Sequence, residues 1–231
     1  MKISQLTDDY LAEFVYGGID GIVTTFAVVS AVAGAGLEPG VVLILGFANL
    51  ISDGLSMGIS AYLAEKSDVD QYRKQRRAVV AGLESSIEKA SKTVQKNLKK
   101  YGFKGKELDS ATKQIAGSKN AADFIMKEEH GLAEEPEGAT AVGFVTFLAF
   151  LIFGVVPLIV YLVDEIFEIG IDSPFAITLG LAGLAFAFIG WLKSRVAKAP
   201  VVSSIAETLV LGLVASGASF YIGRWLETLV G

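Results

Sequence analysis

The sequence predicts an all-α, polytopic membrane protein with five transmembrane helices and a cytoplasmic helical domain inserted between helices 2 and 3. The first observation is composition: 52% of the 231 residues are hydrophobic and only 19% are charged, whereas about a quarter of an ordinary soluble domain is charged. The second is a set of five apolar runs, each as long as the roughly 17–25 residues that a transmembrane helix needs. These runs are residues 14–36, 40–64, 141–163, 174–192 and 201–223.

Turn-forming residues separate the apolar runs and make each one a separate crossing. Pro39-Gly40, Ser173-Pro174 and Ala199-Pro200 stand between successive runs, and such pairs end helices. Because the runs are apolar on every face, their helices must face lipid or one another. The chain therefore divides into residues 1–65 with helices 1 and 2, a cytoplasmic domain of residues 66–138, and residues 139–231 with helices 3 to 5.

The composition reverses in residues 66–138, which hold 15 of the 20 Lys and Arg and 12 of the 25 Asp and Glu. Apolar residues recur there at helical spacing, and Gly131 stands where a helix C-cap is expected. The segment therefore predicts three helices in water. Their expected bounds are residues 73–101, 106–116 and 120–130.

The basic residues predict the orientation in the membrane, because cytoplasmic loops are enriched in Lys and Arg. Residues 66–138 and the loop containing Lys193, Arg195 and Lys198 hold most of the basic residues, whereas residues 36–40 and 164–173 contain acidic residues and no basic ones. The N-terminus and residues 66–138 are therefore expected in the cytosol and the C-terminus outside. Arg224 alone lies on the wrong side for this rule.

The residue counts exclude several kinds of site. With no cysteine, the chain has no disulfide, thiolate zinc site, iron–sulfur cluster or cysteine nucleophile. A single histidine, His130, excludes paired-histidine zinc sites and ferritin-like di-iron motifs. No nucleic-acid partner is expected, because acidic residues are interspersed among the basic ones without an aromatic platform.

Polar stripes on the first two helices predict a metal pathway. A carboxylate at the bilayer centre costs at least ~2.5 kcal/mol, so it normally has a task. Asp20 and Met57 are expected at similar depth, ~10 Å below the cytoplasmic surface, and oxygen ligands with a thioether suit Fe²⁺ or Mn²⁺. Structural hydrogen bonding by the carboxylates and core packing by Met57 are the alternatives. The stripes are Glu13, Gly17, Asp20 and Thr24 on the first helix, and Asn49, Asp53, Met57 and Glu65 on the second.

Glycines beside these stripes suggest close helix packing. Gly17-x-x-x-Gly21 and Gly54-x-x-x-Gly58 are small-x-x-x-small faces, which let two helix backbones approach. Five crossings make a thin bundle, so a homodimer with a pore on its two-fold axis is expected. Ordinary packing within one subunit is the alternative for each glycine motif.

A second candidate metal site lies in the cytoplasmic domain. Glu84 and Glu88 are four residues apart, and Met126, Glu128 and Glu129 crowd the end of the last predicted helix beside His130. Together they offer hard and soft ligands. The alternative is a solvated helix face with interspersed charges.

Three motifs of the chain are distinctive: residues 20–27 (DGIVTTFA), 46–58 (GFANLISDGLSMG) and 124–132 (FIMKEEHGL). The first two resemble the first two helices of the vacuolar iron transporter family, and the third resembles a segment of its cytoplasmic domain. Thr146-Phe147, Gly154 and Pro157-Leu158 resemble the start of its third membrane helix. The resemblance covers nearly the whole chain.

This resemblance implies a homodimer of five-helix subunits that exports Fe²⁺, often also Mn²⁺, from the cytosol in exchange for protons, without an organic cofactor. By resemblance, Asp20 and Met57 are pathway ligands and Glu13 is an acidic residue at the cytoplasmic mouth. Met126 and one of Glu128 or Glu129 match the metal-collecting face. The sequence departs from plant members at Asn49, where they carry glutamate, and in the glutamate-poor first cytoplasmic helix.

The expected function is therefore proton-coupled export of Fe²⁺ or Mn²⁺ through a dimeric pore. Metal would collect at Glu13 and Glu65 and pass Asp20, Met57 and Asp53. The expected partners are a second copy, the lipid bilayer and protons, and the short cysteine-free chain is typical of a prokaryotic plasma membrane. The alternatives are a membrane-anchored metal sensor or scaffold without transport, and a membrane enzyme that pairs Asp20 with Asp53.

Overall fold

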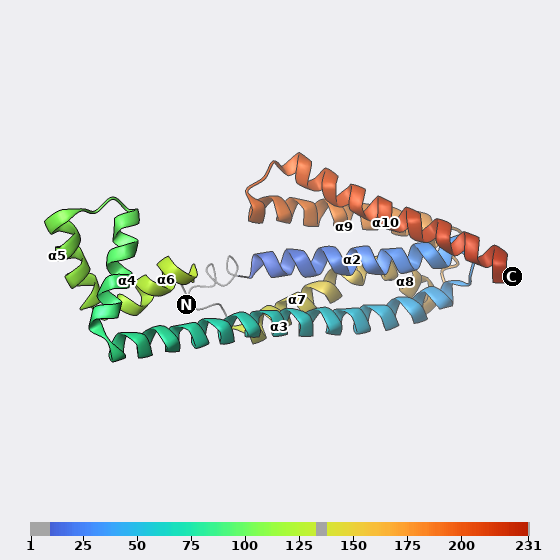
Figure 1. Cartoon of the computed structure of the whole chain (residues 1–231). Helices are drawn as coiled ribbons and strands as arrows, with labels where there is room; N and C mark the ends of the chain where they lie inside the picture. Colours follow the sequence, from blue (N-terminus) through green and yellow to red (C-terminus); the bar gives the residue numbers. More distant parts are fainter. Residues whose placement is uncertain (1–9, 133–137, 231) are drawn as a thin grey trace. The chain divides into compact units, whose positions relative to one another are not determined.

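The computed structural model describes residues 10–132 and 138–230, and within them every regular element is helical (Figure 1). The all-α fold class is confirmed. The elements are α2 (Leu11–Gly34), α3 (Pro39–Ser85), α4 (Ile87–Lys100), α5 (Gly105–Ala116), α6 (Ala121–His130), α7 (Ala139–Gly154), the 3₁₀ turn η1 (Val156–Leu158), α8 (Ile159–Phe167), α9 (Pro174–Ala197) and α10 (Val201–Val230).

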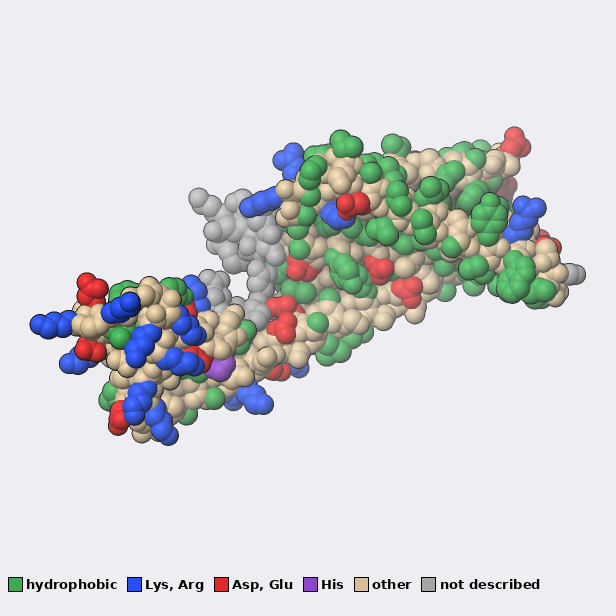
Figure 2. Space-filling model, turned by 45° about the horizontal axis from the view of Figure 1, so that its top comes forward, with side chains coloured by type: hydrophobic (Ala, Val, Ile, Leu, Met, Phe, Trp, Pro, Cys, Tyr) green, Lys and Arg blue, Asp and Glu red, His purple; other side chains and the backbone are tan. Residues whose placement is uncertain are grey.

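Five helical segments are long and apolar enough to cross a membrane: α2, α3, residues Ala139–Phe167, α9 and α10. Hydrophobic side chains also cover much of the visible face of these segments (Figure 2). Large apolar side chains are exposed along the length of α10. An apolar surface of this size requires lipid or a partner to cover it. Its members include Val202, Val210, Leu213, Val214 and Tyr221. The chain is an integral membrane protein.

The chain forms two compact units, with boundaries between Tyr62 and Leu63 and between Ala139 and Thr140. The first unit contains the apolar spans, and the second contains the outer part of α3 with α4, α5 and α6. The helix α3 continues through Tyr62 and Leu63 without a break.

The core of the first unit is centred on α2. Ile22, Phe26 and Val29 are buried there against residues of α3, α7 and α9, among them Leu50 and Phe150. Their burial excludes one face of α2 from lipid. The remaining face is less covered and carries Asp20.

The glycine motifs of α2 and α3 pack against α7 of the same chain. A methyl group at Gly17 or Gly21 would overlap the backbone carbonyl of Thr146 or Phe150, and one at Gly58 would approach the carbonyl of Gly143. Such approach requires glycine because no flexible side chain can give way. Packing within one subunit, the alternative left open by the sequence, is therefore the role of these motifs.

The third span is interrupted, whereas the sequence predicted a single helix over residues 141–163. After Gly154 the chain forms η1 and then resumes as α8. The cause is Pro157, which lacks an N–H and whose ring would meet the Phe153 carbonyl of a regular helix. Pro157 and Leu158 are buried in this turn.

The first cytoplasmic helix was also predicted wrongly, because residues 73–101 form two helices. Ser86 is extended, with φ −161° and ψ 102°, and its Oγ accepts a hydrogen bond of 3.3 Å from the Lys89 N–H. This serine N-cap begins α4 and ends α3. The two later helices agree with the expected bounds to within one residue, and Gly131 has the expected left-handed cap conformation at φ 70°.

Candidate functional site

Asp20 lies beside a hollow in the first unit. The hollow has a volume of about 310 Å³ and is formed by α2 and α10. Apart from Asp20 and Tyr16 its walls are aliphatic, so the carboxylate is its one acidic group among the described residues. The lining residues are Tyr16, Ile19, Asp20, Val23, Leu211, Val214 and Ala215.

Thr24 follows Asp20 by one helical turn, and its hydroxyl is already engaged. Its Oγ1 donates a hydrogen bond of 2.8 Å to the backbone carbonyl oxygen of Asp20. Because the hydroxyl hydrogen of Thr24 is used in this bond, the lone pairs of its oxygen can point toward an ion. A neutral hydroxyl binds a metal ion through these lone pairs.

The polar stripe of α3 contributes a second carboxylate. Asn49, Asp53 and Met57 are all partly buried and follow one another at single helical turns. The Asp53 carboxylate lies close enough to act electrostatically on Asp20. Met57 packs against the core of this unit. Asp20 and Asp53 therefore interact electrostatically from two different spans.

Two further members of the stripes have buried polar atoms without a partner in the described part of the chain. These atoms are Oε2 of Glu13 and Nδ2 of Asn49. A carboxylate oxygen left unpaired in a native fold points to a cation or a water molecule, whereas an amide N–H needs a hydrogen-bond acceptor such as water. Glu65 lies on the part of α3 that belongs to the second unit.

The candidate ligands of the second unit do not form one cluster. Met126 is 0% exposed and lies inside the unit. Glu84 is on α3 and Glu88 on α4, at either side of the break, and Glu88 pairs with Lys92 at 2.8 Å. Among the residues that the structure describes, no three His, Asp or Glu side chains are grouped so that they could hold a metal ion.

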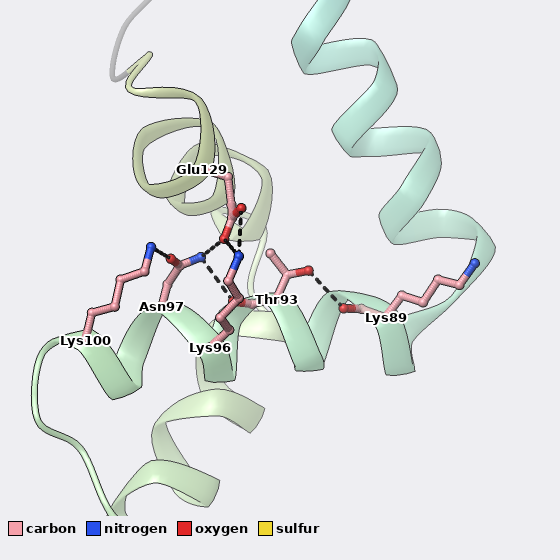
Figure 3. Close-up of polar contacts among 6 residues, drawn as sticks. All are labelled: Lys89, Thr93, Lys96, Asn97, Lys100 and Glu129. Atoms are coloured by element: carbon pink, nitrogen blue, oxygen red, sulfur yellow. Dashed lines mark hydrogen bonds and ion pairs between the residues drawn. The ribbon is translucent and has the colours of Figure 1, made fainter.

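The two carboxylates at the end of α6 are both hydrogen-bonded: Glu129 to α4 (Figure 3) and Glu128 to Tyr101. Glu129 accepts hydrogen bonds from Asn97 Nδ2 at 2.7 Å and Lys96 Nζ at 3.2 Å, and these donors lower its pKa. Glu128 accepts a hydrogen bond of 2.8 Å from the Tyr101 hydroxyl, which raises the pKa of Tyr101. A metal ion would have to displace these donors.

Two parts of the lining of the hollow were not predicted from the sequence. They are the α10 residues and Tyr16. Tyr16 stands four residues before Asp20, and residues at this spacing lie on the same face of a helix, so the sequence could have placed Tyr16 beside Asp20. The α10 residues Leu211, Val214 and Ala215 carry no such signal, because each is an ordinary apolar residue of a span. An ion pair of 2.7 Å between Lys193 and Glu207 also joins α9 to α10.

Comparison with known proteins gives consistent results over nearly the whole chain. The chain is 29% identical to the vacuolar iron transporter of Plasmodium berghei, covering 96% of this chain and 84% of that one. It is 26% identical to vacuolar iron transporter 2 of rice, Oryza sativa subsp. japonica, over 96% and 89% of the two chains. It is also 26% identical to vacuolar iron transporter 1 of Arabidopsis thaliana, over 95% and 87%.

A profile of the VIT family matches residues 11–224. This range includes four of the five spans, most of the fifth, Asp20, Asp53 and the whole second unit. The family is one of transporters, so the alternative of a membrane enzyme is wrong. The chain belongs to the VIT family.

Proposed function

We propose that this protein exports Fe²⁺, with Mn²⁺ as a second substrate, from the cytosol in exchange for protons. The observation that carries the proposal is the partly buried Asp20 beside a hollow of about 310 Å³, with a second partly buried carboxylate, Asp53, acting on it electrostatically from another span. Two carboxylates inside an apolar bundle are costly unless they serve an ion. The relatives named above as iron transporters support iron as the cargo.

The ligand chemistry favours a first-row divalent metal. Carboxylate oxygens from Asp20 and Asp53, an amide from Asn49 and the thioether of Met57 are a mixed hard and soft set. Magnesium and calcium prefer oxygen alone. No organic cofactor is needed for this transport, because the metal ion is the substrate.

The working unit that we propose is a homodimer with the pathway on its two-fold axis. One subunit supplies two carboxylates at this place, which is a sparse shell for a divalent ion. A two-fold axis beside Asp20 would double that number, because each side chain would occur twice. The less covered face of α2 that carries Asp20 supports this arrangement, whereas the glycine motifs face α7 and give it no support.

Proton coupling follows from competition for the same oxygens. A carboxylate binds metal only when deprotonated, so a proton from the far side displaces the metal and metal from the cytosol displaces the proton. Glu13 and Glu65 would receive the ion at the cytosolic mouth. Asp20, Met57 and Asp53 would then pass it outward, with Thr24 and Asn49 as neutral ligands.

The proposed orientation places the N-terminus and residues 66–138 in the cytosol and the C-terminus outside, in a prokaryotic plasma membrane. The distribution of Lys and Arg supports this orientation. The relatives are named for the vacuole, and in such a membrane the same orientation would move metal from the cytosol into the lumen.

Flux measurements on the purified protein in proteoliposomes test the proposal. Fe²⁺ and Mn²⁺ uptake would be followed by a metal-sensitive dye and internal pH by a second dye, with and without an imposed pH gradient. We expect metal entry matched by proton exit, and faster entry when the lumen is acidic. Metal entry without proton movement would remove the coupling, and no flux of either ion in a folded protein would remove the transport function.

A further inference from the structure

The second unit is basic, although its expected role is to collect cations. Residues 66–138 carry 15 Lys and Arg against 12 Asp and Glu. Lys and Arg side chains gather on its surface in Figure 2. Glu88 and Glu129 are in addition paired with lysines. The segment therefore has a small excess of positive charge, and any binding of anions depends on where that charge is concentrated.

One concentration of positive charge lies at the connection between α4 and α5. Residues 99–106 (KKYGFKGK), here called the basic loop, contain four lysines and no acidic residue. No carboxylate of the described chain forms an ion pair with any of these lysines. Between the lysines two aromatic side chains face solvent, with Tyr101 62% and Phe103 38% exposed.

The backbone holds these aromatic residues in place. Gly102 N donates to the Lys99 carbonyl at 3.1 Å and Phe103 N to the Leu98 carbonyl at 3.3 Å. This pair of bonds is a Schellman motif, and it requires the positive φ of 89° at Gly102, which glycine adopts without strain. The Tyr101 hydroxyl is fixed by its bond to Glu128. The exposed rings of Tyr101 and Phe103 therefore belong to a turn whose conformation is fixed by hydrogen bonds.

We propose that the basic loop binds the surface of an anionic lipid bilayer. Exposed aromatic rings settle at the level of lipid headgroups, and lysines place their ammonium groups on lipid phosphates. Lys and Arg near an anionic membrane are attracted within about one Debye length, about 8 Å at physiological salt. The second unit joins the spans at both ends of its sequence, so the bilayer is present at high effective concentration.

Charge distinguishes this partner from a second copy of the chain. Another copy would bring its own basic unit against this loop, and like charges at such a surface repel. A bilayer with anionic lipids offers the opposite sign over a wide area. The inference does not rest on the transported ion, so it stands or falls separately from the proposed function.

The absence of cysteine allows a direct test on the intact protein. Phe103→Cys would be labelled with a nitroxide, whose apolar ring takes the place of the phenyl ring, and reconstituted into lipid nanodiscs. Electron paramagnetic resonance then compares collisions with oxygen, which concentrates in lipid, and with a water-soluble nickel chelate. Gln114→Cys, at an exposed position of α5, is the matched control in the same unit.

In nanodiscs containing phosphatidylglycerol we expect the label at position 103 to be shielded from nickel and accessible to oxygen, and the label at position 114 to remain in water. Phosphatidylcholine nanodiscs should abolish the shielding. Lys104→Gln with Lys106→Gln should lower the ratio of bound to unbound loop roughly thirty-fold, at about 1 kcal/mol for each lysine. Salt at 1 M, where the Debye length is about 3 Å, should act in the same direction.

Three results would overturn the proposal. The first is a label at position 103 that stays accessible to nickel in both lipids. The second is equal shielding in neutral and anionic lipid, because charge would then play no part. The third is dipolar broadening that disappears when labelled protein is diluted with unlabelled protein, which would identify a second copy as the partner.

Discussion

Asn97 of α4 donates a hydrogen bond of 2.7 Å from Nδ2 to Oε1 of Glu129 at the end of α6. Asn97 is 0% exposed, and its Oδ1 accepts a further bond of 2.7 Å from Lys100. Its second amide hydrogen reaches the Thr93 carbonyl at 3.1 Å (Figure 3). One buried amide therefore joins two helices and is satisfied at both ends.

Asn97→Ala should loosen the contact between α6 and α4. The change removes three hydrogen bonds, each typically worth about 0.5–1.5 kcal/mol, and leaves Glu129 bonded to Lys96 alone. Amide hydrogen exchange of residues 121–130 in the intact protein measures this local opening. Lys92→Ala is the control, because it breaks only the exposed pair with Glu88, worth less than about 1 kcal/mol. Equal exchange in the two variants would contradict the role of Asn97.

The attachment of α6 should weaken in acid. The hydrogen bonds from Asn97 and Lys96 lower the pKa of Glu129 below its ordinary value of 4.5. A carboxylate with a lowered pKa contributes stability that is present above the ordinary pKa and is lost as the pH falls through the folded one. Exchange of α6 amides, corrected for the intrinsic rate, should therefore rise below about pH 4.5. In Glu129→Gln this acid dependence should be smaller, and an unchanged dependence would assign it to another group.

Asp20→Asn should abolish metal transport and leave the fold intact. The amide cannot exchange a proton for a metal ion, and a loss of more than about tenfold is expected, since even residues that only orient metal ligands commonly cost 10–100-fold. Proteoliposome flux measures the loss, and circular dichroism checks the helices. Glu165→Gln is a suitable control because it removes an exposed carboxylate on α8. Wild-type flux in Asp20→Asn would exclude Asp20 from the pathway.

The helices and spans could be predicted from the sequence because apolar periodicity and capping residues are local signals. The breaks at Ser86 and Pro157 were missed, although each has a local cause, because apolar residues continue on both sides. The burial of Met126 could not be predicted in this way. It depends on how α6 packs on its neighbours, and a methionine beside glutamates has the same local pattern whether it faces water or the core. The pairing of Glu129 with Asn97 likewise joins residues 32 positions apart.

Gly21→Ala should destabilise the first unit, and Gly180→Ala should not. A methyl group at Gly21 would overlap the Phe150 carbonyl of α7, a backbone atom that cannot turn aside, whereas one at Gly180 of α9 meets open space. Overpacking costs typically about 1–3 kcal/mol, while alanine in a helix interior gains up to about 1 kcal/mol over glycine. Thermal unfolding in one detergent compares the two variants. If Gly21→Ala instead left the unfolding temperature unchanged but weakened the proposed dimer, Gly21 would belong to the contact between subunits and not to the packing of α2 on α7.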